Sequence, residues 1–529
     1  MSQGGTQVKT SRIVLPLLLF VVGSVKVAAG DEPTFEQLLE RLQATENRLQ
    51  QLEQQQLSSP TSFQSASLER PAGGVLVPPV DTVSDEAAVS FEDRLNRLEA
   101  GWQELGDAWA GFEAAEKKKK ADAAKKPTFK INGRIHADFW DFINDDGGVG
   151  FLENPIGTMP ASQVGSDPED RFAFRRIRLE MKGDILDSML WRMQLDFNKP
   201  GTGEMKDMYI GWKNLPKNQV LLLGNQKRPL GLDHLNSSRF NVFTERPFVV
   251  EAFNEDARRP GLAMYGYTDD ERYHWRYGAY YLENITSDGS YLGDQRQMSG
   301  HFRLSSSPWY DNASDGRGYF HWAVAGMVAK PDGDDTNTDG HSNEARFRTR
   351  PEARSSSRWL NTGRIAGADW YEIAAVESIF NVGPLQITGE YMHNFMQRDG
   401  FADLQFHGGY VYVSYILTGE HIPYDRKSGT IGRLQPFENF FLVDRCCGGK
   451  GLGWGAFGVA ARYSYLDISD ADVLGGVGES VTFAANWYWT AYSKVQFNLI
   501  YGDIDDRDPA TGTTGSQYLI AGTRFAIEF

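Results

Sequence analysis

Apolar and polar side chains alternate with a period of two from about residue 128 to residue 529, and this pattern predicts β-strands with one apolar face. Within residues 171–183 (RFAFRRIRLEMKG) the alternation changes phase midway. Phe172 and Phe174 share one face, and Ile177 continues that face only if one residue is inserted. The sequence therefore predicts a β-bulge at Arg175 and Arg176.

The bulge would turn Arg171, Arg175, Arg176 and Arg178 toward the polar face of this strand. An arginine on a lipid-facing wall costs about 2–4 kcal/mol at the centre of a membrane. A strand with an apolar face and an arginine-rich face is therefore predicted to form the wall of a barrel, with lipid outside and water inside.

Alternating segments give about sixteen strands, an even number, as bacterial outer-membrane barrels require. Soluble β-sandwiches also alternate, but their strands are shorter and their turns more evenly sized. The fold class expected is an all-β transmembrane barrel with antiparallel strands. The predicted strands are residues 129–142, 171–183, 191–197, 207–212, 219–227, 260–267, 273–283, 295–304, 319–330, 370–381, 385–395, 404–417, 454–466, 477–489, 494–504 and 517–529.

Connection lengths support a barrel whose first strand runs outward from the periplasm. Long connections would then lie outside the cell and short ones inside. The segment 418–453 does not follow this rule, so it is either a long periplasmic excursion or an error in the strand count. The long connections are 143–170, 228–259, 331–369 and 505–515, and the short ones are 184–187, 214–218 and 269–271.

The first 126 residues have a different pattern. Residues 1–29 combine basic residues, an apolar run from Ile13 to Val22 and a small-residue end, which predicts a signal peptide cleaved after Ala29. A retained membrane anchor is the alternative, but the run is shorter than the roughly 20 residues that a spanning helix needs. Export is expected.

Heptad spacing predicts a short coiled coil at residues 30–57 and an amphipathic helix with a basic end at residues 90–126. The Pro/Ser-rich residues 58–89 between them are predicted to form a linker, and the barrel is predicted to span residues 127–529. The helix either packs on its own chain or self-associates in an oligomer, and self-association is favoured. The lysines from Lys117 to Lys126 are either a solvated spacer or a contact with an anionic cell-wall polymer or lipid headgroups.

The net charge of −16 argues against a nucleic-acid partner. Cys446 and Cys447 are adjacent and form no disulfide framework, so they are either free or joined in a vicinal bridge. No metal-ligand cluster, cofactor motif or catalytic set stands out, and the chain is not expected to be an enzyme. Alternating residues that end on Phe529 resemble the signature read by the outer-membrane assembly machinery.

Short motifs recur in order through the barrel region and together resemble the phosphate-selective porin O/P family. They are residues 174–179 (FRRIRL), 207–212 (DMYIGW), 224–232 (GNQKRPLGL), 237–238 (SS), 245–247 (ERP), 258–261 (RRPG), 417–420 (LTGE) and 461–467 (ARYSYLD). The resemblance implies a homotrimer of sixteen-stranded barrels in the outer membrane. It also implies a third loop folded into each pore, with arginines and a lysine marking an anion path.

Residue by residue, the resemblance places Arg175 and Arg176 in the pore and matches Lys227, or Arg228 beside it, to the anion-binding lysine. Acidic residues in the same loop, such as Glu245 and Glu251, argue against strict phosphate selectivity. The full set of candidate pore residues is Arg134, Arg171, Arg175, Arg176, Arg178, Arg192, Lys227, Arg228, Arg239, Arg246, Arg258 and Arg259.

The function expected is passive diffusion of small anions, with phosphate or polyphosphate as candidates. Guanidinium groups offer paired donors that match phosphate oxygens, and salt screens charges more than about 8 Å away, so an acidic protein can still pass anions. Three alternatives remain. The arginines pair with wall acids such as Glu180, Asp196 and Glu283 and only hold the barrel together; the pore is a non-selective porin; or the barrel is a structural anchor that tethers the envelope through its N-terminal helices.

Overall fold

The computed structural model describes residues 96, 100–104, 106–118, 127–143, 147–157, 159–199, 201–255, 257–285, 296–333, 342–444 and 449–529. The predicted signal peptide, the short coiled coil at 30–57, the linker and both cysteines lie outside these residues. Among the described residues, no helix has both the length and the apolar character that crossing a bilayer requires.

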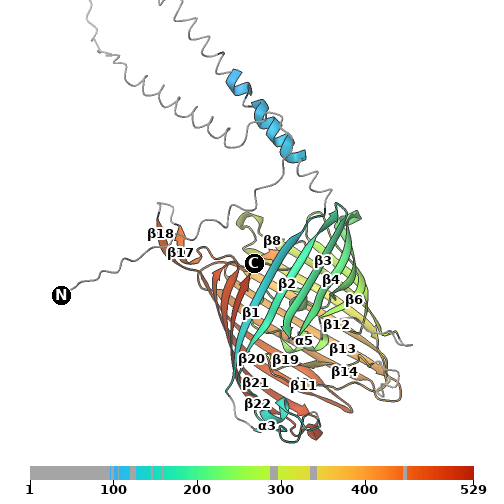
Figure 1. Ribbon diagram of the computed structural model, residues 1–529. Coiled ribbons are helices and arrows are strands. Elements are labelled where there is room, and N and C mark those ends of the chain that lie inside the picture. Colours follow the sequence, from blue (N-terminus) through green and yellow to red (C-terminus); the bar gives the residue numbers. More distant parts are fainter. Residues whose placement is uncertain are drawn as a thin grey trace, which may run out of the picture. The chain divides into compact units, whose positions relative to one another are not determined.

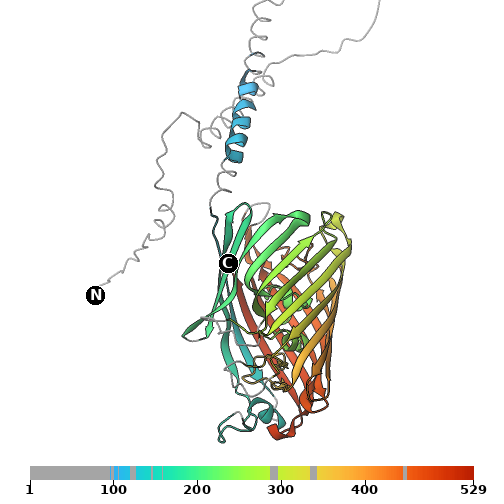
Figure 2. The same cartoon turned by 90° about the vertical axis from the view of Figure 1, so that its right-hand side faces the viewer.

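Sixteen antiparallel strands form one closed barrel, and each strand pairs with its neighbours in chain order (Figures 1 and 2). This confirms the predicted antiparallel barrel and its number of strands, whereas the predicted N-terminal coiled coil is not supported. Several strands are longer than predicted; β4, for example, begins at Thr202, where a polar segment continues the ladder. The strands are β1 (Lys130–Phe142), β2 (Arg171–Leu186), β3 (Met189–Lys199), β4 (Thr202–Leu215), β5 (Gln219–Lys227), β6 (Arg258–Tyr267), β7 (Tyr273–Tyr281), β8 (Met298–Tyr310), β9 (Gly318–Lys330), β12 (Ala368–Val382), β13 (Leu385–Arg398), β14 (Leu404–Ile416), β19 (Ala456–Asp470), β20 (Val473–Thr490), β21 (Ser493–Arg507) and β22 (Ser516–Glu528).

Burial alternates along the strands as the sequence pattern requires. On β13, Ile387 and Tyr391 are exposed on the outer surface, whereas Gln386, Thr388 and Glu390, which alternate with the outward positions, are buried. Successive side chains of a strand point to opposite faces, so the apolar set faces outward and the polar set faces the interior. The buried inner face shows that the barrel interior is largely filled.

The predicted bulge is present in β2. His136 on β1 pairs with Arg176 and the next residue, Ala137, pairs with Phe174, so Arg175 is the extra residue. The bulge restores the phase of the alternation, and Phe174 and Ile177 both keep the lipid-facing side. Arg175 and Arg176 both line the interior, as the phase change predicted.

The connections differ in length between the two ends of the barrel. Short turns such as 187–188 and 383–384 share one end with the long segment 417–455, here named T6. The sixteen-strand ladder is unbroken on both sides of T6, so the strand count holds and T6 is a long excursion at the short-turn end. It carries two hairpins, β15 (Tyr424–Asp425) with β16 (Thr430–Ile431), and β17 (Phe440–Asp444) with β18 (Lys450–Trp454).

Two loops from the opposite end fold into the barrel. Loop L3 (residues 228–257) carries α4 (Leu232–Leu235) and α5 (Phe248–Phe253), and loop L5 (residues 331–367) carries the hairpin of β10 (Arg348–Thr349) and β11 (Leu360–Asn361). A smaller helix, α3 (Gly147–Glu153), lies in the first long loop, where Glu153 accepts a 2.7 Å hydrogen bond from Trp359 of L5.

The interior of the barrel contains an apolar core, which is unusual for a water-filled pore. It joins Leu232, Phe243 and Phe248 of L3 with Trp359 of L5 and Ile431 of T6. These side chains pack with the inner faces of β9, β12–β14 and β19–β22. The loops therefore occupy one side of the interior and leave the open space next to the wall of β1–β7.

Helical residues are described at 96, 100–104 and 106–118, within the helix predicted at 90–126. Trp102, Trp109 and Phe112 are exposed, and the rings of Trp109 and Phe112 lie 6.1 Å apart. Their spacing of seven and three residues places them along one side of the helix.

Candidate functional site: an arginine-lined passage

The open space is a cavity of about 860 Å³ between the wall of β1–β7, the loops L3 and L5, and T6. Fifteen lysines and arginines line it, against six aspartates and glutamates. The lining is therefore strongly positive although the whole chain carries a net charge of −16. The basic residues of the lining are Arg134, Arg175, Arg176, Arg178, Arg192, Lys199, Lys206, Lys227, Arg246, Arg258, Arg276, Arg350, Arg354, Arg358 and Arg433.

Eight of the twelve residues predicted from the sequence line this passage: Arg134, Arg175, Arg176, Arg178, Arg192, Lys227, Arg246 and Arg258. The other four are not among its lining residues. Arg228 and Arg259 donate hydrogen bonds to backbone carbonyls of Glu255 and Leu282, Arg239 lies 3.7 Å from Glu528, and Arg171 lies at the start of β2.

Several lining arginines are paired with acids of the wall. Arg178 lies 2.6 Å from Asp196, and Arg192 lies 2.6 Å from Glu180. Arg258 pairs with Asp207 of β4 at 2.7 Å. These pairs lie on adjacent or neighbouring strands, so part of the arginine charge is neutralised in the way that the structural alternative predicted.

Four lining arginines, Arg134, Arg176, Arg276 and Arg354, have no acidic partner within the described part of the chain. Arg134 donates to Ser238 of L3 at 3.1 Å, and Arg176 lies 3.4 Å from His136. Arg354 of L5 makes no hydrogen bond with the described residues. The neighbouring charge of Arg175, followed by burial, lowers the pKa of Arg354 to about 9 from its usual 12.5. The guanidinium group stays charged at neutral pH, and the shift reflects a positive potential that an anion would relieve.

Lys227, the predicted anion-binding lysine, lines the passage but is engaged with the loop. Its ammonium group donates to the carbonyls of His234, Leu235 and Asn236 at 2.7, 3.0 and 2.9 Å. An ammonium group has three donors, and all three are used here. Lys227 therefore fixes the end of α4 and keeps L3 in place.

The sequence interpretation missed the arginines of L5. Arg350, Arg354 and Arg358 line the passage, and they come from residues 346–358 (RFRTRPEARSSSR). The density of arginine in this stretch was a usable signal. It was missed because the alternating pattern ends before L5, so nothing in the sequence placed the loop inside the barrel.

Loop L3 is held to the wall by buried carboxylates. Glu245 of L3 accepts hydrogen bonds from Arg175 at 2.7 and 3.0 Å and from Arg524 of β22 at 2.7 Å. Burial raises the pKa of Glu245, but Arg175 and Arg524 outweigh it and hold this pKa well below 4.5. Across the barrel, the carboxylate of Glu390 of β13 accepts hydrogen bonds from the backbone N–H groups of Leu232 and Asp233, both at 2.7 Å.

The first part of T6 reaches the passage from the short-turn end. The backbone N–H of Ile431 donates to Asn236 of L3 at 3.1 Å, and Arg276 of β7 donates to the carbonyl of Ser428 at 3.1 Å. Tyr424 stacks on Tyr319 of β9 with ring centroids 5.1 Å apart. The passage is therefore bounded by L3 and L5 from one end and by T6 from the other.

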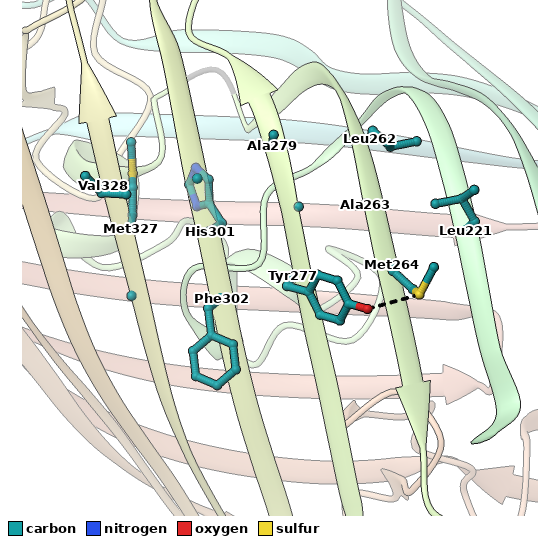
Figure 3. Close-up of a pocket in the computed structure, with 13 residues that line it drawn as sticks. Leu221, Leu262, Ala263, Met264, Tyr277, Ala279, His301, Phe302, Met327 and Val328 are labelled. Carbon is teal, nitrogen blue, oxygen red and sulfur yellow. Dashed lines mark hydrogen bonds between the residues drawn. The ribbon is translucent and has the colours of Figure 1, made fainter. Parts of the chain in front are cut away.

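A second cavity of about 730 Å³ lies on the outer wall across β5–β9 (Figure 3). The outward side chains Leu262, Tyr277, Phe302 and Val328 are exposed around Gly300. Figure 3 shows the lining residues spread across neighbouring strands, with the hydroxyl of Tyr277 donating to the sulfur of Met264. This hollow belongs to the apolar outer surface and is separate from the passage.

A closed sixteen-stranded barrel with an apolar outer face and a charged passage defines a porin. Residues 157–529 match the family model described as phosphate-selective porin O and P. The chain belongs to this family of bacterial outer-membrane channels.

Similar proteins include an uncharacterised protein of Caulobacter vibrioides, 25% identical over 418 residues, which cover 76% of this chain and 74% of the relative. Among solved structures, the anion-selective porin of Comamonas acidovorans is 10% identical, with a TM-score of 0.44, and the match covers 76% of this chain and 99% of that chain. The outer-membrane channel DcaP of Acinetobacter baumannii is 11% identical, with a TM-score of 0.43, over 76% of this chain and 98% of that chain.

Proposed function

We propose that this porin passes small anions by diffusion and that phosphate-like oxyanions interact with its passage. The observation that carries the proposal is the positive lining of the cavity, in which Arg134, Arg176 and Arg354 have no acidic partner among the described residues. Guanidinium groups without a carboxylate keep free donors for an anion that has lost part of its hydration shell.

The arrangement of these arginines favours movement between shallow sites. Arg134 of β1 pairs in register with Arg178 of β2. Two residues further along β1, His136 pairs with Arg176 of β2. Two residues of a strand span about 7 Å, so Arg134 and Arg176 belong to successive levels of the wall. Arg354 lies beside Arg175 in the same region. An anion held weakly at each level is released to the next, whereas one deep site would retain it.

Loops L3 and L5 with T6 would make this passage the narrow part of the pore. A narrow passage matters because two unit charges about 4 Å apart interact by about 4 kcal/mol at an effective dielectric constant of 20, but by only about 1 kcal/mol in bulk water. The paired arginines Arg178, Arg192 and Arg258 contribute less, which favours a modest anion preference over strict phosphate selectivity.

Reversal potentials in planar bilayers under a KCl gradient test the proposal. The unmodified protein should prefer chloride, and the triple variant Arg134→Ala, Arg176→Ala, Arg354→Ala should lose most of that preference. The matched control is the same triple change to lysine, which keeps the charges. Cation preference in the unmodified protein would overturn the proposal.

Added phosphate tests the oxyanion part separately. Phosphate should reduce the chloride current through the unmodified protein. It should reduce the current through the lysine variant less strongly, because lysine lacks the planar fork of donors that arginine has. Arg171→Ala, which removes a β2 arginine outside the passage, should leave the block unchanged. If phosphate blocks the alanine triple variant as strongly as the unmodified protein, these three arginines do not hold the phosphate.

We also propose that the protein forms a homotrimer through its N-terminal helix. The exposed Trp102, Trp109 and Phe112 give the helix an apolar side that suits association with the same helix of another copy. Deletion of residues 31–126 distinguishes this role from tethering to an anionic cell-wall polymer through Lys117 to Lys126. Loss of trimers supports assembly, whereas intact trimers with a weakened envelope support the tether.

A further inference from the structure

The second hairpin of T6 leaves the barrel on its outer side. β17 and β18 pair over five residue pairs, from Phe440 with Trp454 to Asp444 with Lys450. Figure 1 shows this hairpin beyond the rim at the short-turn end, outside the ring of strands. T6 thus has two parts with different positions: the hairpin of β15 and β16 inside the barrel, and the hairpin of β17 and β18 outside it.

The base of the outer hairpin is joined to aromatic residues on the lipid-facing wall. The ring of Phe440 lies 4.7 Å from that of Trp487 and 5.7 Å from that of Trp489, both on β20. The indole N–H of Trp487 donates to the carbonyl of Trp454 at 2.7 Å, and Phe457 stacks on Trp487 at 5.4 Å. The hairpin is therefore continuous with an aromatic cluster of the outer wall.

The hairpin exposes large apolar side chains to its surroundings. Phe441, Leu442, Leu452 and Trp454 are 57%, 58%, 54% and 63% exposed. Charged side chains of the described hairpin are confined to the end away from the barrel wall, where Lys450 pairs with Asp444 at 2.9 Å. Four exposed large apolar residues in two five-residue strands would be unfavourable in water and are typical of a surface that contacts a partner.

We propose that the hairpin of β17 and β18 inserts its apolar side chains into the periplasmic leaflet of the outer membrane. The lipid-facing belt of the barrel is adjacent, and the contacts of Phe440 and Trp454 with Trp487 make the two surfaces continuous. Tryptophan and tyrosine are enriched at the level of the headgroups, which matches a tryptophan cluster at the rim. The proposal rests on the location of the barrel in the outer membrane and is independent of its anion preference.

Fluorescence quenching distinguishes lipid from water around the hairpin. Cys446 and Cys447 are replaced by serine, and a single cysteine at Leu442 or Leu452 carries an environment-sensitive label in phosphatidylcholine vesicles. Bromine atoms on the acyl chains should quench both labels strongly, as they quench a label at Phe483 on the lipid-facing side of β20. Aqueous iodide should quench a label at Lys427, which lies in T6 with an exposed side chain, several-fold more than a label at Leu442.

A second variant keeps the proposal testable if the label perturbs the hairpin. Leu442→Asp with Leu452→Asp should leave the barrel folded, shown by an unchanged heat-modifiable mobility on gels, and should move a label at Phe441 from bromolipid quenching to iodide quenching. Two results would overturn the proposal. Labels at Leu442 and Leu452 that iodide reaches as readily as Lys427 would place the hairpin in water, and labels shielded from both quenchers that cross-link between copies would place it at a subunit contact.

Discussion

Arg175 on β2 donates two hydrogen bonds, at 2.7 and 3.0 Å, to the carboxylate of Glu245 in loop L3. Arg175 is also the extra residue of the β2 bulge. The bulge therefore does more than correct the phase of the strand, because it supplies the guanidinium group that holds L3 against the wall. One inserted residue links the lipid-facing pattern of β2 to the position of the loop that bounds the passage.

Deleting Arg175 tests this dual role. Removal of the bulged residue leaves Phe174 and Ile177 on the lipid side, so the barrel should fold and show normal heat-modifiable mobility. The ion pair with Glu245 is lost, and the channel should show noisier currents with a smaller reversal potential. Deleting Arg178, which lies in the regular part of the ladder, is the control. It shifts every following side chain to the other face, and no folded barrel is expected.

Substitution of Glu390 tests the other attachment of L3. Glu390→Ala leaves the N–H groups of Leu232 and Asp233 without their acceptor, which should cost about 1–3 kcal/mol in local stability. Single-channel recordings should show more frequent conductance changes with an intact barrel. Glu390→Gln keeps one oxygen acceptor and should be intermediate. A rigid, unchanged channel in Glu390→Ala would mean that these hydrogen bonds do not hold the loop.

The inner part of T6 should limit conductance. Replacement of residues 422–433 by a glycine and serine chain of equal length removes the contact of Ile431 with Asn236 and opens the passage from the short-turn end. Single-channel conductance should rise. The same replacement of residues 449–454, in the outer hairpin, should leave conductance unchanged, because that hairpin lies outside the passage.

Neutralising an acid of L3 should raise the anion preference. Glu255 accepts hydrogen bonds from Arg348 at 2.6 Å and from Arg358 at 2.9 Å, and Arg358 lines the passage. Glu255→Gln removes a negative charge whose interaction at about 4 Å is worth about 1–4 kcal/mol, depending on the local dielectric constant. Reversal potentials should shift toward the chloride limit. A shift toward cations would show that Glu255 acts only by positioning L5.

Acid should loosen L3 through Glu245. Arg175 and Arg524 hold the pKa of Glu245 in the folded protein well below its usual value of 4.5. A carboxyl group with a depressed folded-state pKa stabilises the protein fully above the unfolded value and loses that contribution as the pH falls through the folded value. Thermal unfolding should therefore show a stability loss that begins below about pH 4.5. Glu245→Gln should lower stability at neutral pH and flatten this dependence.

The barrel follows directly from the pattern of apolar and polar residues along the chain. Period-two alternation records which face of each strand meets lipid and which meets the interior, so the number of strands, the outward face of each strand and the bulge at Arg175 and Arg176 could all be predicted. The same rule placed Arg134, Arg175, Arg176, Arg178 and Arg192 on the inner side of the wall, because a charged side chain on a membrane strand has only one acceptable side. The resemblance to the porin family, and not the alternation, gave the other three residues that line the passage, Lys227, Arg246 and Arg258.

Which of these charges lack an acidic partner depends on contacts that form only in the folded barrel. Arg178 meets Asp196 across adjacent strands, whereas Arg176 and Arg134 do not meet an acid, and this difference depends on the register and on where L3 lies. Loops carry no periodic pattern, so the arginines of L5 and the inward hairpin of T6 could not be placed from the sequence. Their positions follow from packing on the far wall, where Trp359 and Ile431 join the apolar core, and that contact exists only once the barrel has closed.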